Sequence, residues 1–150
     1  MSNSQQVLVP RRRTHNARRA SSVLELCLVL PILLMLSFGI VDYGYFLYVK
    51  NTVQGAAEAA ARAAIPATAT NSSVNTVITN MMAAAGLQNS GYTVAFSPTD
   101  VSTAAAGATV TVTIAVSWGN VGTHTLSAGY GGISNSKQIT GAAVMIKESS

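Results

Sequence analysis

One apolar run constrains this chain more than any other feature of its sequence. From Val23 to Val49 the residues are mostly Leu, Val, Ile, Phe, Met and Tyr. A membrane-spanning helix needs about 20 such residues, and at about 1.5 Å per residue this run reaches roughly 40 Å. The run therefore predicts a transmembrane helix, which we place at residues 21–49.

The charge distribution gives this helix a direction. Only 9% of the residues are charged, against about 25% in ordinary soluble domains. Five arginines precede the apolar run and make residues 1–20 a basic leader: Arg11, Arg12, Arg13, Arg18 and Arg19. The positive-inside rule predicts that this leader stays in the cytoplasm while the rest of the chain crosses outward. Because the net charge of +4 comes from the leader, we predict no nucleic-acid-binding surface.

An Ala-rich stretch predicts that the helix continues beyond the membrane through residues 50–66. Within it, Glu58 and Arg62 have the i, i+4 spacing of a helix ion pair. Pro66 predicts that the helix ends by about Ala64 or Ile65. Pro31, inside the apolar run, removes one backbone hydrogen bond and predicts a kink or a loosened turn.

Residues 67–150 predict a small head outside the membrane. Residues 71–86 fit a helix with a Ser or Asn cap near residue 72 and a stop at Gly86. Three further segments alternate like strands, at residues 91–98, 108–118 and 138–149. The glycine-rich residues 119–137 predict a long loop or hairpin.

These segments give an α+β fold class. A long N-terminal transmembrane helix continues outside the membrane and leads into the head. The head holds one helix and an antiparallel sheet of about three or four strands. One face of this sheet is apolar and can pack on a helix, and the other is rich in threonine.

A search for catalytic residues finds little. The histidines are His15, in the basic leader, and His124, in a Gly/Thr loop. The carboxylates of the head, Asp100 and Glu148, are too few for a convincing acid–base pair. The single cysteine, Cys27, permits neither an intramolecular disulfide nor a Cys-rich metal site. We predict that the protein is not an enzyme and holds no cofactor or metal.

Glu25 stands three residues inside the apolar run, where a charge is costly. One interpretation is structural, because Ser22 and Glu25 have the spacing of a capping box at a helix start. The other is functional. If the chain is cut between Ala20 and Ser21, Glu25 lies one helical turn from the new amine and can neutralise the amine of a neighbouring subunit.

The sequence around Glu25 resembles the N-terminus of TadE-like proteins, the pilin-like (pseudopilin) components of tight-adherence pili. The family pattern has paired arginines, a small residue at the cut, a glutamate, a Leu-Pro element, Phe-Gly with an acidic residue, and an Ala-rich tail. In this chain those features fall on Arg18-Arg19, Ala20, Glu25, Leu30-Pro31, Phe38-Gly39, Asp42 and residues 56–64 with Glu58 and Arg62. Ala20 stands where the family usually has Gly. The resemblance covers about a third of the chain.

The resemblance implies assembly as the function. A prepilin peptidase would cut between Ala20 and Ser21, and Glu25 would set the register with a neighbour. Other pilin-like subunits, the lipid bilayer and a pilus assembly platform would be the partners. The expected location is the bacterial inner membrane, with the N-terminus in the cytoplasm and the head outside, or a surface pilus.

Three further residues of the helix are candidate assembly residues in this scheme. They are Pro31, Gly39 and Asp42. Gly39 and Gly44 permit close helix approach, although glycine is also common in ordinary membrane helices. Asp42 can lie at the outer membrane boundary beside the tyrosines, or it can pair within a helix bundle.

Alternative functions differ in what happens to the leader. A membrane-anchored surface protein would keep its leader and never polymerise. A secreted protein would lose a signal peptide, but the apolar run is longer than a normal signal sequence. A major filament subunit would be shorter in this family, so the head of residues 67–150 favours a minor subunit.

Overall fold

The computed structural model describes residues 15–123 and 132–148. The chain divides into two compact units, Met1–Leu36 and Ser37–Ser150, and helix α1 (His15–Ala63) passes through both. The predicted leader arginines Arg11, Arg12 and Arg13 lie outside the described residues, as do His124 and much of the predicted loop.

The fold class is α+β, as predicted. After α1 come helix α2 (Asn71–Ala84) and strands β1 (Thr93–Ser97), β2 (Thr109–Ser117) and β3 (Gln138–Ile146). A 3₁₀ turn, η1 (Val101–Thr103), precedes β2, and a short helix, α3 (Trp118–Val121), follows it. The described strands form an antiparallel sheet in the order β1-β2-β3.

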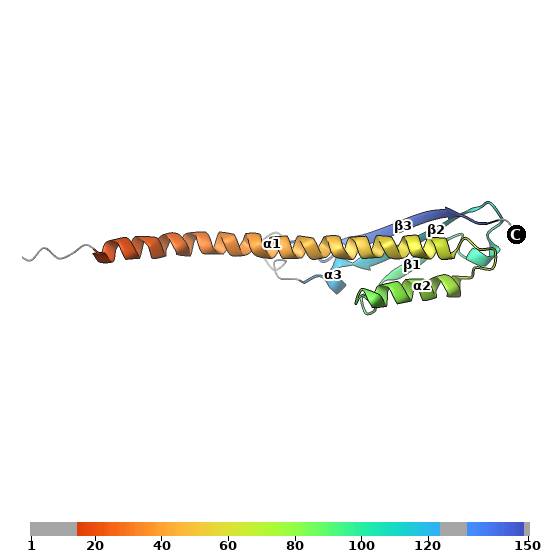
Figure 1. Cartoon of the computed structure of the whole chain (residues 1–150), viewed down its shortest axis with the longest axis horizontal. Coiled ribbons are helices and arrows are strands. Elements are labelled where there is room, and N and C mark those ends of the chain that lie inside the picture. Colours follow the sequence, from red (N-terminus) through yellow and green to blue (C-terminus); the bar gives the residue numbers. More distant parts are fainter. Residues whose placement is uncertain (1–14, 124–131, 149–150) are drawn as a thin grey trace, which may run out of the picture. The chain divides into compact units, whose positions relative to one another are not determined.

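Two helices cover one face of this sheet. Strand β2 buries Val110, Val112, Ile114 and Val116, whereas its threonines are partly or fully exposed. In the second unit, the C-terminal part of α1 and the inner face of α2 join these side chains in one apolar core (Figure 1). The predicted division into an apolar face and a Thr-rich face is therefore confirmed.

Helix α2 ends just before Gly86, as the sequence predicted. Gly86 adopts φ +73°, a left-handed conformation that favours glycine. The Gly86 amide donates to the carbonyl of Ala83, and the Leu87 amide donates to that of Met82. These two hydrogen bonds are the Schellman motif, which satisfies the last carbonyls of the helix. Leu87 and Met82 both belong to the buried core, as is common for the two residues at these positions of the motif.

The N-cap of α2 differs from the prediction of a Ser or Asn near residue 72. Thr70 is the N-cap, and its hydroxyl accepts a hydrogen bond from the Ser73 amide. Ser73 completes a reciprocal capping box through the Thr70 backbone amide. Threonine and serine both serve as caps, so the short polar run at residues 70–73 could not fix which residue would take that role.

Candidate functional site

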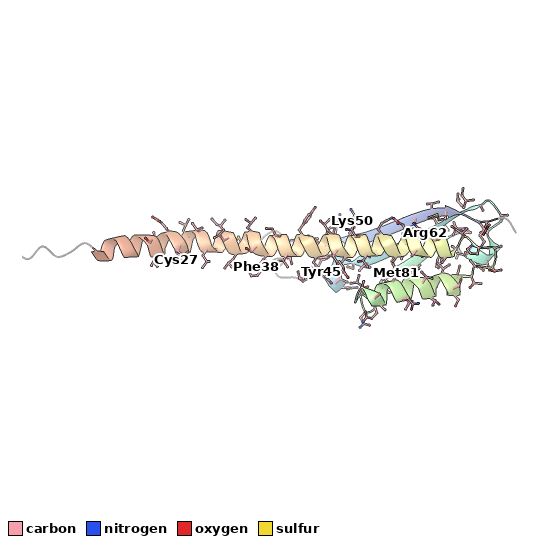
Figure 2. The ribbon with its side chains drawn as sticks, in the orientation of Figure 1. Cys27, Phe38, Tyr45, Lys50, Arg62 and Met81 are labelled. Atoms are coloured by element: carbon pink, nitrogen blue, oxygen red, sulfur yellow. The ribbon has the colours of Figure 1, made fainter. Side chains whose placement is uncertain are left out.

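From Val23 to Val41, helix α1 is apolar on every side apart from Glu25 and Ser37. Among the described residues, the large apolar side chains from Val23 to Val41 are 40% exposed or more. Figure 2 shows Cys27 and Phe38 on this part of the helix. A helix that is apolar all round is either a membrane span or the core of an assembly. Each such side chain left in water forgoes roughly 1.5–3 kcal/mol of burial, so this segment requires lipid or protein around it.

Length and composition lead to the same conclusion. Within the part of α1 from Ser22 to Ala63, an apolar window is long enough to cross a membrane, and none of it is buried in the structure. The predicted helix end is also confirmed, because α1 ends at Ala63. The helix assignment continues without a break through Pro31, where the sequence predicted a kink or a loosened turn.

Glu25 is exposed and is the one charged residue between Ser22 and Val41. Helix α1 begins at His15, so Ser22 lies inside the helix and is not its N-cap. The interpretation of Ser22 and Glu25 as a capping box at the helix start is therefore wrong in this structure. Arginine and alanine are good helix formers, and the stretch before Ser22 extends the helix toward the N-terminus.

The predicted cut between Ala20 and Ser21 falls within the helical backbone of α1. Arg18 and Arg19 precede it on the same helix. The side chains of residues 15–21 lie outside the described ones, so the role of Ala20 as a cleavage residue stays a prediction.

From Ser22 onward, Asp42 is the first buried residue of α1, with 7% of its surface exposed. Its carboxylate accepts a hydrogen bond from the hydroxyl of Thr123, which follows α3. Within the second unit, this bond joins two residues that are 81 positions apart in the sequence. A buried carboxylate requires hydrogen-bond donors, and in this fold the head supplies one. Sequence reasoning had left Asp42 between the membrane boundary and a helix bundle, and it missed this partner.

The aromatic residues after Asp42 have divided roles. Tyr43 is 60% exposed, as expected for a residue at a membrane interface. Tyr45 and Phe46 instead pack on Trp118, with ring centroids 6.0 Å and 5.4 Å from its ring. The sequence placed these tyrosines beside the outer membrane boundary, and no local pattern could show that two of the aromatic residues pack on Trp118, which lies far along the chain.

Strand β3 approaches the backbone of α1 closely at Gly141. A Cβ at this position would lie 2.6 Å from the carbonyl oxygen of Val53 and 2.8 Å from the backbone of Gln54. Only glycine fits such an approach. A glycine inside a strand pattern is a known signal of close backbone contact, and it was the one signal in the sequence that could have revealed this contact.

Hydrogen bonds from the Gln54 side chain link α1 to Ala142, the residue after Gly141 in β3. The side-chain amide of Gln54 donates to the Ala142 carbonyl at 3.2 Å and accepts from the Ala142 amide at 3.3 Å. The same nitrogen donates to Glu58 at 3.1 Å. These bonds occupy backbone groups at the edge of the sheet, which would otherwise be open to pairing. Glu58 thus holds Gln54 in place, and the predicted ion pair of Glu58 with Arg62 stays a prediction.

Two glycines of α1, Gly44 and Gly55, are not required by any close contact within the described chain. Apart from the adjoining residues and nearby backbone of α1 itself, no described atom lies within 4 Å of a Cβ built at Gly44 or at Gly55. The two are 11 residues apart, about three helical turns, so they lie on the same face. Gly55 also lines an open groove of about 510 Å³ between α1 and α2, together with Tyr48 and Met81. The Gly39 position is partly buried.

Two charged residues of the head, Asp100 and Lys147, have structural roles. Asp100 caps the 3₁₀ turn, and hydrogen bonds from the Ser102 hydroxyl and amide lower the pKa of its carboxyl. Lys147 is buried and donates to the Val101 carbonyl at 3.0 Å. Within residues 15–123 and 132–148, no three or more His, Cys, Asp or Glu side chains gather as a metal site would require.

Comparison with known proteins bears on α1. Residues 20–62 match a family model described as TadE-like protein, which confirms the resemblance seen in the sequence. This family suggests a pilus-associated, pilin-like protein, and the apolar part of α1 is a candidate membrane span. No curated protein and no solved structure matches the chain.

Proposed function

With residues 20–62 identified as a TadE-like segment, we propose that this chain is a pilin-like (pseudopilin) subunit of a tight-adherence pilus or a related secretion apparatus. It assembles through its N-terminal helix after removal of a basic leader. The observation that carries the proposal is the exposed, mostly apolar surface of residues 23–41, in which Glu25 is the one charged residue. That surface has two suitable environments, the bilayer and a bundle of like helices.

The leader sets the topology before assembly. Its arginines hold the N-terminus in the cytoplasm, and the head is outside the bacterial inner membrane. The apolar residues 22–41 provide about the length that a bilayer needs. Asp42 is buried under Thr123 of the head, which supports an outer membrane boundary near Val41, earlier than the Val49 expected from the apolar run.

Cleavage would give Glu25 its function. A prepilin peptidase cuts between Ala20 and Ser21 and leaves the Ser21 amine one helical turn before Glu25. Inside a helix bundle, an unpaired carboxylate is costly. The amine of a neighbouring subunit neutralises it, and only one stagger between subunits brings the two charges together. Glu25 therefore selects the register in which the assembly platform adds each subunit.

The glycine face of α1 supports subunit contact. Gly44 and Gly55 are on one face of the helix, and the described part of the chain does not require glycine at either position. Glycine lowers helix stability by about 0.5–1 kcal/mol relative to alanine. Small residues let a second helix approach closely, so close packing against a neighbouring subunit accounts for both positions.

Substitution of Glu25 tests the proposal. Glu25→Ala and Leu26→Ala are expressed in the native cells, and pili are sheared from the surface and separated from membranes. We expect both variants to reach the membrane and to lose their leaders. Glu25→Ala should be missing from the assembled fraction, and Leu26→Ala should be present. Equal incorporation of the two variants would contradict the role of Glu25 in assembly.

A further inference from the structure

The open groove between α1 and α2 lies within the second unit and has a volume of about 510 Å³. That volume is within the roughly 300–1,000 Å³ of well-formed binding sites, so the groove has room for side chains of another molecule. Figure 2 shows Met81 on α2, one of the residues that line it. The described lining residues are Tyr48, Asn51, Thr52 and Gly55 from α1, and Met81, Ala84 and Ala85 from α2.

The fold holds the walls of this groove in place. The Tyr48 hydroxyl of α1 donates a hydrogen bond to the Ala85 carbonyl, just after α2, at 3.3 Å. Met82 anchors α2 in the core, whereas the adjoining Met81 is 39% exposed at the groove. Gly55 places no side chain in the groove, and the space around it is open within the described chain. A preformed groove lowers the entropy cost of binding.

The lining of the groove favours an uncharged, apolar partner. None of its described lining residues is charged, so a charged group placed there would lose its water without gaining a counter-charge. Met81 and Ala84 form an apolar wall on α2, and a methionine side chain adapts its shape to an apolar partner. Asn51 is exposed to water, so its amide does not have to be matched by the partner.

The chain itself carries a segment with the matching chemistry. From Leu26 to Val41, helix α1 has no charged residue, and its large apolar side chains are at least 40% exposed. This segment is about 24 Å long, whereas the groove-lining stretch of α1, residues 48–55, is about 12 Å long. The segment needs protein around it once it leaves the lipid. A second copy of the chain therefore supplies an apolar helix that is long enough to fill the groove.

We propose that the groove between α1 and α2 of one subunit receives the apolar segment, residues 26–41, of a second copy of this chain. The inference rests on the proposed function, because assembly is the step that takes this segment out of the bilayer. The groove and the segment are different surfaces, so the contact is heterologous and repeats from copy to copy as in an open filament. Glu25 lies outside the segment, since the groove offers its carboxylate no counter-charge.

The proposed membrane topology gives this contact a direction and a stagger. All copies cross the membrane in the same direction, so the two α1 helices run parallel. The middle of residues 48–55 is about 18 residues beyond the middle of residues 26–41, a shift of roughly 27 Å along the helix. The occupying subunit is raised by that amount relative to its partner, which moves its apolar segment from lipid onto protein. The contact of Glu25 with a neighbouring amine needs a shift of about one turn and involves a different neighbour.

Site-specific photo-crosslinking in the native cells tests the contact. A diazirine amino acid replaces Met81 in the groove or, as the matched control, Ala83, which is exposed on α2 and does not line the groove. Sheared pili are irradiated, crosslinked dimers are isolated, and the joined peptides are identified by mass spectrometry. We expect the Met81 probe to link to residues 26–41 of a second copy and the Ala83 probe not to. The proposal is overturned if the Met81 probe links only to lipid, to another protein or to a different part of the second copy, or gives no link.

Filling the groove is the second test. Gly55→Leu places a side chain in the groove, and Ala83→Leu adds the same bulk outside it. Because the described chain leaves open space around Gly55, both variants should keep a folded head, as measured by urea unfolding. Gly55→Leu should lower the amount of protein in sheared pili at least about tenfold, and Ala83→Leu should leave it unchanged.

The outcome for the wild type separates this inference from the proposed function. If the wild type is present in sheared pili and Gly55→Leu is incorporated equally well, the groove is not an assembly site and the proposed function stands. If the wild type itself is missing from the pili, the proposed function and this inference both fail.

Discussion

The two parts of helix α1 bury their side chains in different ways. From Ser22 to Val41 the described chain leaves the residues of α1 exposed, and only Gly39 is partly buried. From Asp42 to Ala63 one face is buried against the sheet and α2, and the other face stays open. The second part is a structural element of the head, stabilised by the chain's own core. The first part depends on surroundings that the described chain does not supply, and this difference is the reason why we propose it as the part that enters the membrane and the assembly.

The largest loss of stability is expected at Gly141, where β3 approaches the backbone of the second part of α1 most closely. Gly141→Ala would place a Cβ 2.6 Å from the Val53 carbonyl oxygen. The backbones must separate, so we expect the head to lose about 3 kcal/mol of stability. Urea unfolding followed by the fluorescence of Trp118, the single tryptophan, measures it. Gly44→Ala, with open space around it among the described residues, is the control and should stabilise the helix by about 0.5–1 kcal/mol.

Truncating one apolar side chain in each part of α1 tests directly whether only the second part stabilises the head. Val53 is fully buried, so Val53→Ala should cost about 2 kcal/mol in the same unfolding measurement. Leu28 is 67% exposed, and Leu28→Ala should leave the stability of the head unchanged. A clear loss of head stability in Leu28→Ala would show that the first part packs against the head, and the contrast between the two parts would then be wrong.

We expect a smaller loss of stability at the junction between the two parts of α1, where Thr123 bonds to Asp42. Thr123→Val keeps the shape of the side chain but removes a hydroxyl that donates to the buried carboxylate of Asp42. We expect a loss of about 1.5 kcal/mol. Thr113→Val changes the same residue type on the open face of β2 and should be near neutral. If both variants unfold at the same urea concentration, the hydrogen bond to Asp42 does not stabilise the junction.

The smallest expected effect lies far from α1, at Asp100. Hydrogen bonds from Ser102 lower the pKa of the Asp100 carboxyl in the folded state. The folded state then binds fewer protons than the unfolded state, so this contribution to stability is present at neutral pH and is lost as the pH falls below about 4. An NMR titration should show the Asp100 pKa moving up toward its ordinary value in Ser102→Ala. An unchanged titration would rule out the Ser102 hydroxyl as a cause, since Ser102→Ala keeps the backbone amide bond.

Local signals in the sequence predicted the elements well. The alternation of apolar residues and threonine predicted β2, Pro66 predicted the end of α1, and Gly86 predicted the end of α2. These signals are local because a proline or a left-handed glycine acts on its own backbone. Strand β2 ends one residue before the prediction, because Trp118 begins α3 and turns into the core.

Contacts between distant segments could not be predicted in the same way. Asp42 and Thr123 are 81 residues apart, and Gln54 and Ala142 are 88 apart. No local pattern pairs such residues, since the register between a helix and a sheet depends on the whole core. For the candidate site, Glu25 and the apolar helix could therefore be predicted from the sequence. The position at which α1 joins the head, Asp42, could be seen only in the structure.

The most direct test of assembly after leader cleavage is the intact mass and N-terminal sequence of the protein from its own cells, beside those of Ala20→Arg. We predict a wild-type chain that begins at Ser21 and an Ala20→Arg chain that keeps its leader. A wild-type chain that still carries Arg11 to Arg19 would contradict the proposed mechanism. Glu25 would then have no neighbouring amine to neutralise, and the protein would be a single-pass membrane-anchored surface protein that is neither processed nor polymerised.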